Sequence, residues 1–221
     1  MSFAKVFRLE PGDELLSTAM VSDSLDAIGL RNQVLPKRLA PLVPGSRMIG
    51  SAKTVQFAPS LAVNPDDPYG DAIDFISAVV AGQVVVISTG VSNDSAFWGE
   101  LFSAAALGAG AVGVVTDGNL RDTDKIARLG FPAFSPGRRP IDFRARMRIV
   151  EHDAPVTLYG VHVAPGDLIL ADDDGVVVVP AEREEEVLDI ARQRASSEST
   201  VLAELLAGAT LRDVWDRHKV L

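Results

Sequence analysis

Apolar positions follow helical spacing in some segments of the chain and extended spacing in others. Residues 14–28 repeat apolar side chains at helical intervals and stop at Gly29, which is typical of a helix end. Residues 47–59 favour an extended segment, and a loop rich in Pro, Asp and Gly separates them from a short helix at 72–80. A strand at 84–89 follows, so helix and strand alternate.

The alternation continues in the middle of the chain. It predicts a helix at residues 100–109, a strand at 111–116, a turn or helix at 121–129 and a short strand at 131–134. The helix at 100–109 is apolar on nearly every face, which favours a buried helix. Strands of β-branched residues between helices are typical of a layered α/β fold with buried strands.

From Pro155 onward the pattern indicates hairpins rather than crossovers. Three short β-rich runs, separated by Pro-Gly and Asp-Gly turns, make up "PVTLYGVHVAPGDLILADDDGVVVVP". This pattern predicts β/β/α layering instead of a plain doubly wound sheet. Residues from about 181 to 221 form a long helical pattern that is acidic early and contains Arg later, as suits the helix dipole. We expect one α/β domain, residues 1–221, whose C-terminal helical tail could reach a neighbouring subunit.

The composition narrows the functions that this fold could carry. The 221 residues include 21 Lys and Arg against 30 Asp and Glu, a net charge of −9 that repels phosphate backbones and anionic membranes. We therefore expect neither nucleic acid nor a membrane as a partner. The absence of Cys excludes thiolate catalysis and Cys-based zinc sites. The start, "MSFAKVFRLEPGDELL", lacks the apolar run of a secretory signal, and we expect a cytoplasmic protein.

Three other patterns are better explained by structure than by chemistry. Residues 108–113 form a G-x-G-x-x-G string after a helix and before a strand, the reverse of the dinucleotide-binding order, so we expect close packing there. The Asp run at 172–174 lacks the distal Glu of a calcium loop and predicts a hairpin turn. His152, His162 and His218 lack the spacing of a zinc site.

Glu100, Arg121 and Asp122 are predicted to meet at one edge of the sheet. A helix from Glu100 to Gly110 descends roughly 15 Å at 1.5 Å per residue. A strand from Ala111 to Thr116 returns roughly 18 Å at about 3.3 Å per residue. Because the two distances nearly cancel, the three side chains should lie at the carboxyl end of a strand, where open α/β sheets bind ligands.

These residue types suit a small oxo acid. Gly99 allows an anion to approach the first N–H groups of the helix. Arg121 suits a carboxylate or keto oxygen, and Asp122 suits a hard divalent cation that keeps most of its waters. Glu100 could then hold or deprotonate a water. The alternatives are a solvated helix cap or a purely structural ion pair.

The spacing of these residues resembles a known family. Glu100, twenty intervening residues and then Arg121-Asp122 are embedded in "WGE", "GVVTDGNLRD" and "PGDLILADDDGVVVVP". This pattern resembles the RraA-like proteins, which include the class II pyruvate aldolases acting on 4-hydroxy-4-methyl-2-oxoglutarate and 4-carboxy-4-hydroxy-2-oxoadipate. The likeness covers most of the chain, and it implies a layered β/β/α fold of the swivelling-domain type.

The resemblance implies a role for each matching residue. The substrate's pyruvyl end would sit against the backbone of a short segment made of Gly99, Glu100, Leu101 and Phe102. Arg121 would bind the keto oxygen, and Asp122 would carry Mg²⁺, Mn²⁺ or another divalent cation, mostly through waters. A Glu from the C-terminal helix of a neighbouring subunit would help Glu100 to hold the catalytic water, and Glu198 in "RASSES" fits by position.

The implied activity is retro-aldol cleavage of a 4-hydroxy-2-oxo acid to pyruvate, with oxaloacetate decarboxylation as a side activity through the same enolate. The family favours trimers and hexamers. The alternative function, also found in the family, is a protein-binding regulator that inhibits a ribonuclease without turnover. The chain departs from the family at Gly82-Gln83, where many relatives have Gly-Asp. Residues 60–70 also offer no clear basic pair for further substrate carboxylates.

Overall fold

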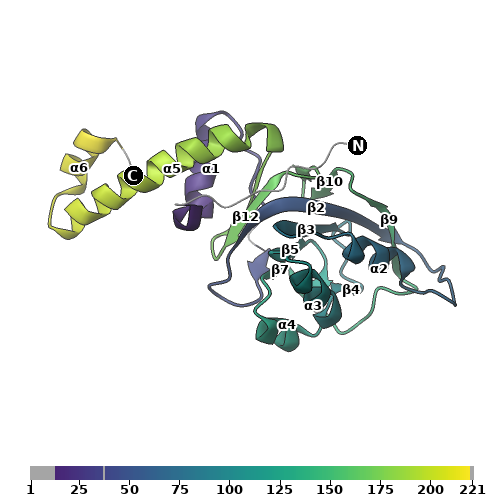
Figure 1. The fold of residues 1–221 in the computed structure, drawn as a ribbon. Helices are drawn as coiled ribbons and strands as arrows, with labels where there is room; N and C mark the ends of the chain where they lie inside the picture. Colours follow the sequence, from purple (N-terminus) through teal and green to yellow (C-terminus); the bar gives the residue numbers. More distant parts are fainter. Residues whose placement is uncertain (1–12, 37, 220–221) are drawn as a thin grey trace.

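A twisted eight-stranded sheet forms the centre of the computed structural model, which describes residues 13–36 and 38–219 (Figure 1). The spatial order is β1-β7-β5-β3-β2-β12-β13, and β9 also pairs with β2. In chain order the strands are β1 (Ala40–Pro41), β2 (Met48–Pro59), β3 (Gln83–Ser88), β5 (Gly113–Thr116), β7 (Ala133–Ser135), β9 (Met147–His152), β12 (Leu168–Asp172) and β13 (Gly175–Val179).

The middle of the sheet is parallel and its borders are antiparallel. β2, β3, β5 and β7 run parallel to one another, whereas β1, β9, β12 and β13 each pair antiparallel with a neighbour. Every residue of β3 and β5 is buried. Such strands need cover on both faces, which is why their sequences are continuous β-branched runs.

Different layers cover the two faces of the sheet. α2 (Gly70–Ser77), α3 (Glu100–Gly108) and α4 (Thr123–Leu129) cover one face (Figure 1). The hairpin of β10 (Val156–Leu158) and β11 (Val161–Val163) packs on the opposite face. Two of the three buried clusters lie in these two layers. The predicted β/β/α layering is therefore confirmed.

A second, three-stranded parallel sheet contains the strands that immediately precede α3 and α4. It consists of β4 (Ala96–Trp98), β6 (Asn119–Leu120) and β8 (Gly137–Arg138), in that order. The sequence pattern did not predict these strands because they have only two or three residues each, too few to show a period.

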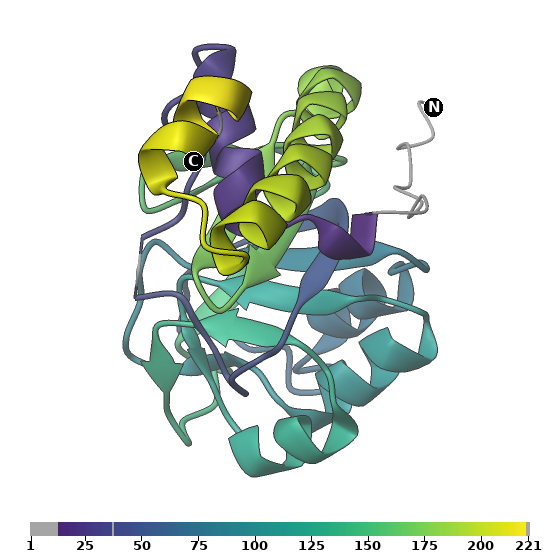
Figure 2. The same cartoon turned by 90° about the vertical axis from the view of Figure 1, so that its left-hand side faces the viewer.

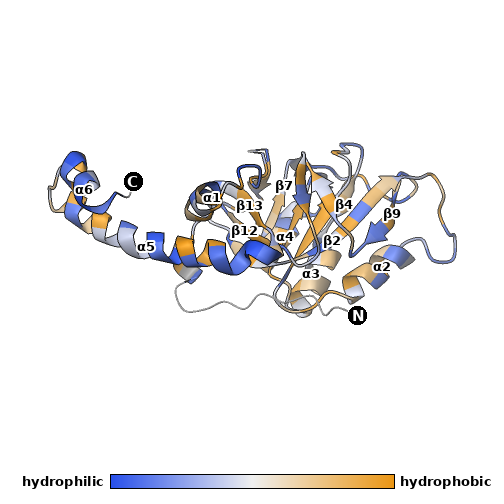
Figure 3. Cartoon of the chain, turned by 90° about the horizontal axis from the view of Figure 1, so that it is seen from above, coloured by the Kyte–Doolittle hydropathy of each residue, from blue (hydrophilic) through white to orange (hydrophobic). Residues whose placement is uncertain are grey.

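The remaining helices lie at the β12–β13 end of the sheet. α1 (Thr18–Ala27) lies beside α5 (Glu184–Leu206), as Figure 2 shows, and both pack on β12 and β13 in the third buried cluster. Short 3₁₀ turns precede both helices: η1 (Asp13–Leu15) before α1 and η2 (Ala181–Arg183) before α5. α5 extends beyond the sheet and carries α6 (Leu211–His218) at its end (Figure 3).

The structure corrects four details of the predicted elements. The first helix starts at Thr18 instead of residue 14, because Ser17 caps it by accepting the Met20 N–H at 3.2 Å. The segment from 155 holds four strands in two hairpins instead of three runs. The tail divides into α5 and α6 at Gly208, which has φ +96°. α3 is not a buried helix, since only Ser103 and Ala106 are buried.

The Asp run at 172–174 and the glycine string at 108–113 have the structural roles that we expected. Asp172 and Gly175 flank the turn of the β12–β13 hairpin. In the glycine string, a Cβ on Gly110 would lie 2.8 Å from the Ala81 Cβ, so helix and neighbouring turn pack closely there. Among the described residues, none of the helices has both the length and the apolar content required to cross a bilayer.

Candidate functional site

The small parallel sheet brings the predicted residues together. β4 leads directly into Gly99 and α3, and β6 leads into Arg121 and α4. β4 and β6 are parallel neighbours, so their carboxyl ends lie at the same edge. The Arg121 N–H donates to the Trp98 carbonyl at 2.9 Å, which fixes the two chain exits side by side. The predicted meeting is thus confirmed, although β6 rather than β5 makes the final approach.

The start of α3 is an open backbone surface next to Arg121 and Asp122. Gly99 is the N-cap of α3 and makes no side-chain cap bond. A Cβ on Gly99 would lie 3.0 Å from Asp122 Oδ2 and 3.1 Å from Arg121 Cγ. Asp122 itself has φ 53° and ψ 34°, a left-handed conformation that turns its side chain back toward Gly99. Helix N–H groups, a guanidinium and a carboxylate therefore face one small space.

Ion pairs connect the polar groups of the site. Arg121 Nε lies 3.8 Å from Asp122 Oδ2. Lys125 Nζ donates to Glu100 Oε2 at 2.9 Å, and this hydrogen bond raises the pKa of Lys125. Lys125 was missed by sequence reasoning, although its position one helical turn after Asp122 places it on the same side of a helix.

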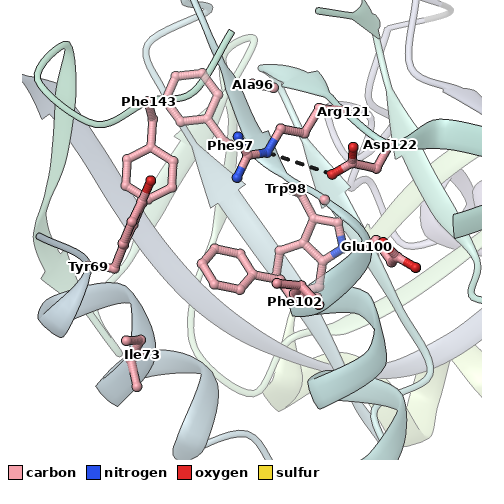
Figure 4. Close-up of a pocket in the computed structure, with 12 residues that line it drawn as sticks. Tyr69, Ile73, Ala96, Phe97, Trp98, Glu100, Phe102, Arg121, Asp122 and Phe143 are labelled. Atoms are coloured by element: carbon pink, nitrogen blue, oxygen red, sulfur yellow. Dashed lines mark ion pairs between the residues drawn. The ribbon is translucent and has the colours of Figure 1, made fainter. Parts of the chain in front are cut away.

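A cavity of about 440 Å³ opens at this edge of the molecule. Gly99, Glu100, Arg121 and Asp122 line one end of it, and Figure 4 shows the labelled polar side chains gathered there. The opposite end is lined by Tyr69, Ile73 and Phe143, with Phe97, Trp98 and Phe102 between. Ala96 and Leu101 complete the lining. The cavity therefore has a charged end and a mainly apolar end, whose polar group is the Tyr69 hydroxyl.

Asp142 does not line the cavity, but it holds two side chains that do. Its Oδ2 accepts hydrogen bonds from the Tyr69 hydroxyl at 2.6 Å and from Arg121 Nη1 at 3.0 Å. Its Oδ1 accepts the Arg144 N–H at 2.9 Å. The backbone next to it is fixed as well, because the Ala96 N–H donates to the Ile141 carbonyl at 2.7 Å.

These contacts shift two pKa values in opposite directions. Burial raises the pKa of Asp142, but the Arg144 N–H, the Tyr69 hydroxyl and the Arg121 charge outweigh burial and bring the pKa below its usual value. The hydrogen bond to Asp142 raises the pKa of Tyr69, and burial adds to the effect. Tyr69 and Asp142 are 73 positions apart, so spacing along the chain held no signal for this contact.

Arg144, in the loop before β9, and Arg148, in β9, lie near the apolar end but outside the cavity. The Arg144 guanidinium lies 5.7 Å from the centre of the Tyr69 ring. Arg144 and Arg148 line a neighbouring hollow of about 350 Å³, which shares Tyr69 and Phe143 with the cavity. The basic residues that residues 60–70 lack thus come from a later part of the chain, at the start of β9 and just before it.

Glu198 lies away from the other predicted residues of its own chain. It is on α5 and lines a separate hollow between α1 and α5 with Leu15, Asp23 and Leu202. Asp23 pairs with Arg194 at 2.6 Å, which supports a structural role for that carboxylate. A role for Glu198 at the site of a neighbouring subunit stays a prediction.

The donor set fits a cation that keeps its waters rather than a cage of protein ligands. Among the described residues, no group of three or more His, Cys, Asp or Glu side chains is placed to hold a metal ion. Asp122 is partly exposed, and its Oδ2 faces the open Cα of Gly99. Magnesium is often held by one or two carboxylates together with substrate oxygens and waters. Asp122 fits such a site.

Relatives of known sequence indicate the family to which this chain belongs. The chain is 33% identical over 198 residues to the "Putative 4-hydroxy-4-methyl-2-oxoglutarate aldolase" of Halalkalibacterium halodurans, covering 84% of this chain and 87% of that one. It is 31% identical over 195 residues to protein DlpA of Legionella pneumophila. That match covers 88% of this chain but only 31% of DlpA, so this chain corresponds to less than a third of that relative.

A solved structure and a family model give the same assignment. The structure of RraAS2 from Streptomyces coelicolor, described as an unusual member of the RNase ES inhibitor RraA family, superposes with a TM-score of 0.73 at 29% identity and covers 88% of this chain and 98% of that one. The RraA-like family model, described as Aldolase/RraA, matches residues 18–178. The chain, with its β/β/α layers and its acidic, Arg-Asp edge, belongs to the RraA-like family.

Proposed function

We propose that this protein is a divalent-metal-dependent lyase that cleaves a 4-hydroxy-2-oxo acid to pyruvate and a second oxo compound. The observation that carries the proposal is the convergence of Glu100, Arg121 and Asp122 on the uncapped start of α3 at one end of a cavity of about 440 Å³. A solvated helix cap would require neither the cavity nor a Gly whose Cβ position is crowded by two neighbouring side chains.

The polar end has groups for each part of a pyruvyl acid. The first N–H groups of α3 can bind the carboxylate, because they point out of the helix start and carry its positive dipole end. Arg121 can donate to the keto oxygen with the N–H groups that Asp142 does not use, since a guanidinium has five. Glu100 uses Oε2 for Lys125, so Oε1 can accept a water.

The charge balance favours a cation at this site. Three carboxylates, from Glu100, Asp122 and Asp142, stand against the two cations Arg121 and Lys125. An anionic oxo acid would therefore meet an excess of negative charge. A divalent cation held by Asp122 would reverse that excess and, when bound, would polarise the keto oxygen as a Lewis acid.

The reaction then follows from the positions of the chain's own groups. A water held by Glu100 takes the proton of the C4 hydroxyl, and the electrons of that O–H bond form the C4 carbonyl. The C3–C4 bond breaks, and its electron pair passes to C2 and C3 as the pyruvate enolate. Arg121 stabilises the negative charge on the enolate oxygen, and C3 then takes a proton to give pyruvate. Decarboxylation of oxaloacetate would use the same enolate.

The direct test is pyruvate release from oxaloacetate and from 4-hydroxy-2-oxo acids, with Mg²⁺ or Mn²⁺ and with EDTA. We expect release only with the metal, and a loss of about 100-fold or more in Arg121→Ala, typical for removal of a donor to a developing oxyanion. Arg128→Ala is a matched control, because Arg128 lies on α4, which follows Arg121 directly, in an exposed pair with Asp124. Absence of metal-dependent release from all substrates would contradict the proposal.

A second candidate function is binding to a ribonuclease without turnover. The Streptomyces relative, described as a member of an RNase ES inhibitor family, supports this candidate. The two functions predict different results for one variant. Arg121→Ala would leave ribonuclease inhibition intact if the binding surface lies elsewhere, whereas it would abolish lyase activity.

A further inference from the structure

The apolar end of the cavity is suited to the part of the substrate that leaves. Tyr69, Ile73 and Phe143 line the cavity away from Glu100 and Asp122 (Figure 4). With the pyruvyl end at Gly99 and Arg121, the groups beyond C4 would extend toward these three residues. Ile73 on α2 is 52% exposed, so its apolar side chain is available to contact a ligand. Phe143 is buried and packs edge-on against Tyr69, with ring centres 5.8 Å apart. This end is an aromatic and aliphatic wall.

The polar groups nearest this end already face a carboxylate of the chain itself, that of Asp142. The Tyr69 hydroxyl and Arg121 Nη1 both donate to Oδ2 of Asp142. A substrate carboxylate between them would have to displace Asp142 and would face its negative charge. Like charges in a poorly hydrated site repel strongly, so this arrangement discriminates against a second carboxylate.

Arg144 is a further cation close to this wall, but it lies outside the cavity. Arg144 lies against the Tyr69 ring and is exposed in the neighbouring hollow, and it does not line the cavity. Tyr69 and Phe143 form the partition between the two hollows. A carboxylate inside the cavity would have to bypass this partition to reach Arg144.

We propose that the cavity selects 4-hydroxy-2-oxo acids whose substituent at C4 is uncharged and apolar, an alkyl or aryl group, and that Asp142 excludes those with a carboxylate there. This specificity rests on the lyase function proposed above. The second product would then be an aliphatic or aromatic aldehyde or ketone. Each methylene group buried against this wall increases affinity about fourfold.

Two pairs of compounds test the proposal. The first is 4-hydroxy-2-oxo-4-phenylbutanoate against 4-hydroxy-2-oxoglutarate, which differ only in phenyl or carboxylate at C4. We expect kcat/KM for the phenyl compound to be higher by about tenfold or more. The second is 2-oxo-4-phenylbutanoate against 2-oxoglutarate, whose affinities in Mg²⁺ are measured by calorimetry. Equal or tighter binding and turnover of the carboxylated compounds would overturn the proposal.

Failure of the specificity can be separated from failure of the lyase function. Exchange of the pyruvate methyl protons in D₂O passes through the same enolate and involves no C4 substituent. Exchange together with a preference for carboxylated substrates would overturn the specificity and leave the function standing. If neither exchange nor cleavage occurs, the lyase function fails, and the calorimetric comparison still decides whether the cavity prefers apolar groups.

Two variants assign the preference to the wall and to Asp142. Ile73→Lys should reduce the phenyl-to-carboxylate ratio about tenfold or more by placing a cation at the apolar end. The control is Val80→Lys, which is 48% exposed just after α2 and does not line the cavity. Asp142→Asn should reduce the ratio as well, by removing the repulsion. An unchanged ratio in both Ile73→Lys and Asp142→Asn would contradict the assignment.

Discussion

At the scale of single residues, Gly99 is required for the space in front of α3. Its φ of −151° is extended backbone that alanine also adopts, so the backbone alone does not demand glycine. The missing Cβ does matter, because it would lie within 3.1 Å of both Asp122 Oδ2 and Arg121 Cγ. A methyl group at this position would push both side chains by a few tenths of an ångström and, in the proposed binding mode, would compete with the substrate for this space.

Gly99→Ala should therefore impair binding without unfolding the protein. We expect pyruvate affinity in Mg²⁺, measured by calorimetry, to fall about tenfold or more, while the melting temperature changes little. The matched control is Gly108→Ala at the end of the same helix, where a Cβ would meet nothing within 4 Å. Normal pyruvate affinity in Gly99→Ala would show that this space is not the binding site.

The ionisation of Asp142 should contribute to acid stability. Its pKa is lower in the folded protein than the ordinary value of 3.8. The native contacts of the carboxylate therefore stabilise the fold above pH 3.8, and this contribution is lost as the pH falls through the folded pKa. Asp142→Asn should be less stable than wild type near pH 6, with a smaller difference near pH 3, when urea unfolding is compared at both values. A difference that is the same at both pH values would contradict this assignment.

The sequence predicted the charged end of the site better than its apolar end. Glu100, Arg121 and Asp122 depend on one helix and the strand that follows, so local periodicity was enough to bring them together. Tyr69 and Asp142 meet through the packing of α2 against a loop after β8, and neither belongs to a pattern along the chain. Contacts that depend on the placement of distant elements cannot be derived from spacing.

At the scale of elements, long strands and helices were predictable and short ones were not. β2 and β3 agree with the expected segments, and in β3 a run of β-branched residues identifies a buried strand. β4, β6 and β8 are too short to have a period, yet they position the site. α3 was expected to be buried because of its apolar sequence. Leu101, however, is 79% exposed, and only the face of α3 that carries Ser103 and Ala106 is buried.

The start of α1 depends on an element far away in the chain. Asp172, at the end of β12, accepts hydrogen bonds from the Thr18 N–H at 2.8 Å and from the Thr18 hydroxyl at 2.6 Å. This carboxylate satisfies an N–H of the first helical turn and ties α1 to the β12–β13 hairpin. The Asp run that resembled a calcium loop thus has a capping role.

Asp172→Ala should destabilise the protein by about 1–2 kcal/mol, the usual cost of losing a helix cap. Urea unfolding followed by circular dichroism measures the change. Asp174→Ala is the matched control, because the Asp174 side chain is exposed in the same turn. Equal stability of both variants would contradict a capping role for Asp172.

At the scale of the whole molecule, α5 and α6 extend away from the sheet (Figure 3), and large apolar side chains on them are exposed. Leu202, Leu206, Leu211 and Trp215 are the large ones. Such a surface is typical of a helix that packs on another subunit. Glu198 lies on α5, far along the chain from Arg121. A site that uses both residues would need α5 of one subunit and the sheet edge of the next.

Mixing of inactive variants tests this arrangement directly. Glu198→Gln and Arg121→Ala should each be nearly inactive as pure oligomers. After the two are mixed under conditions that allow subunit exchange, one pairing of neighbours contains both an intact Arg121 and an intact Glu198. With random exchange in a closed ring, about one quarter of the wild-type activity should return.

The control and the contrary outcomes assign the role of Glu198. Glu185→Gln, an exposed substitution near the start of the same helix, should be active without mixing. Full activity of pure Glu198→Gln would remove Glu198 from the mechanism. Inactive variants that regain nothing on mixing, although sedimentation shows mixed trimers or hexamers, would mean that Glu198 acts only within its own subunit. Because Glu198 and the cavity lie at separate hollows of one chain, recovery of activity is the result that the monomer structure favours.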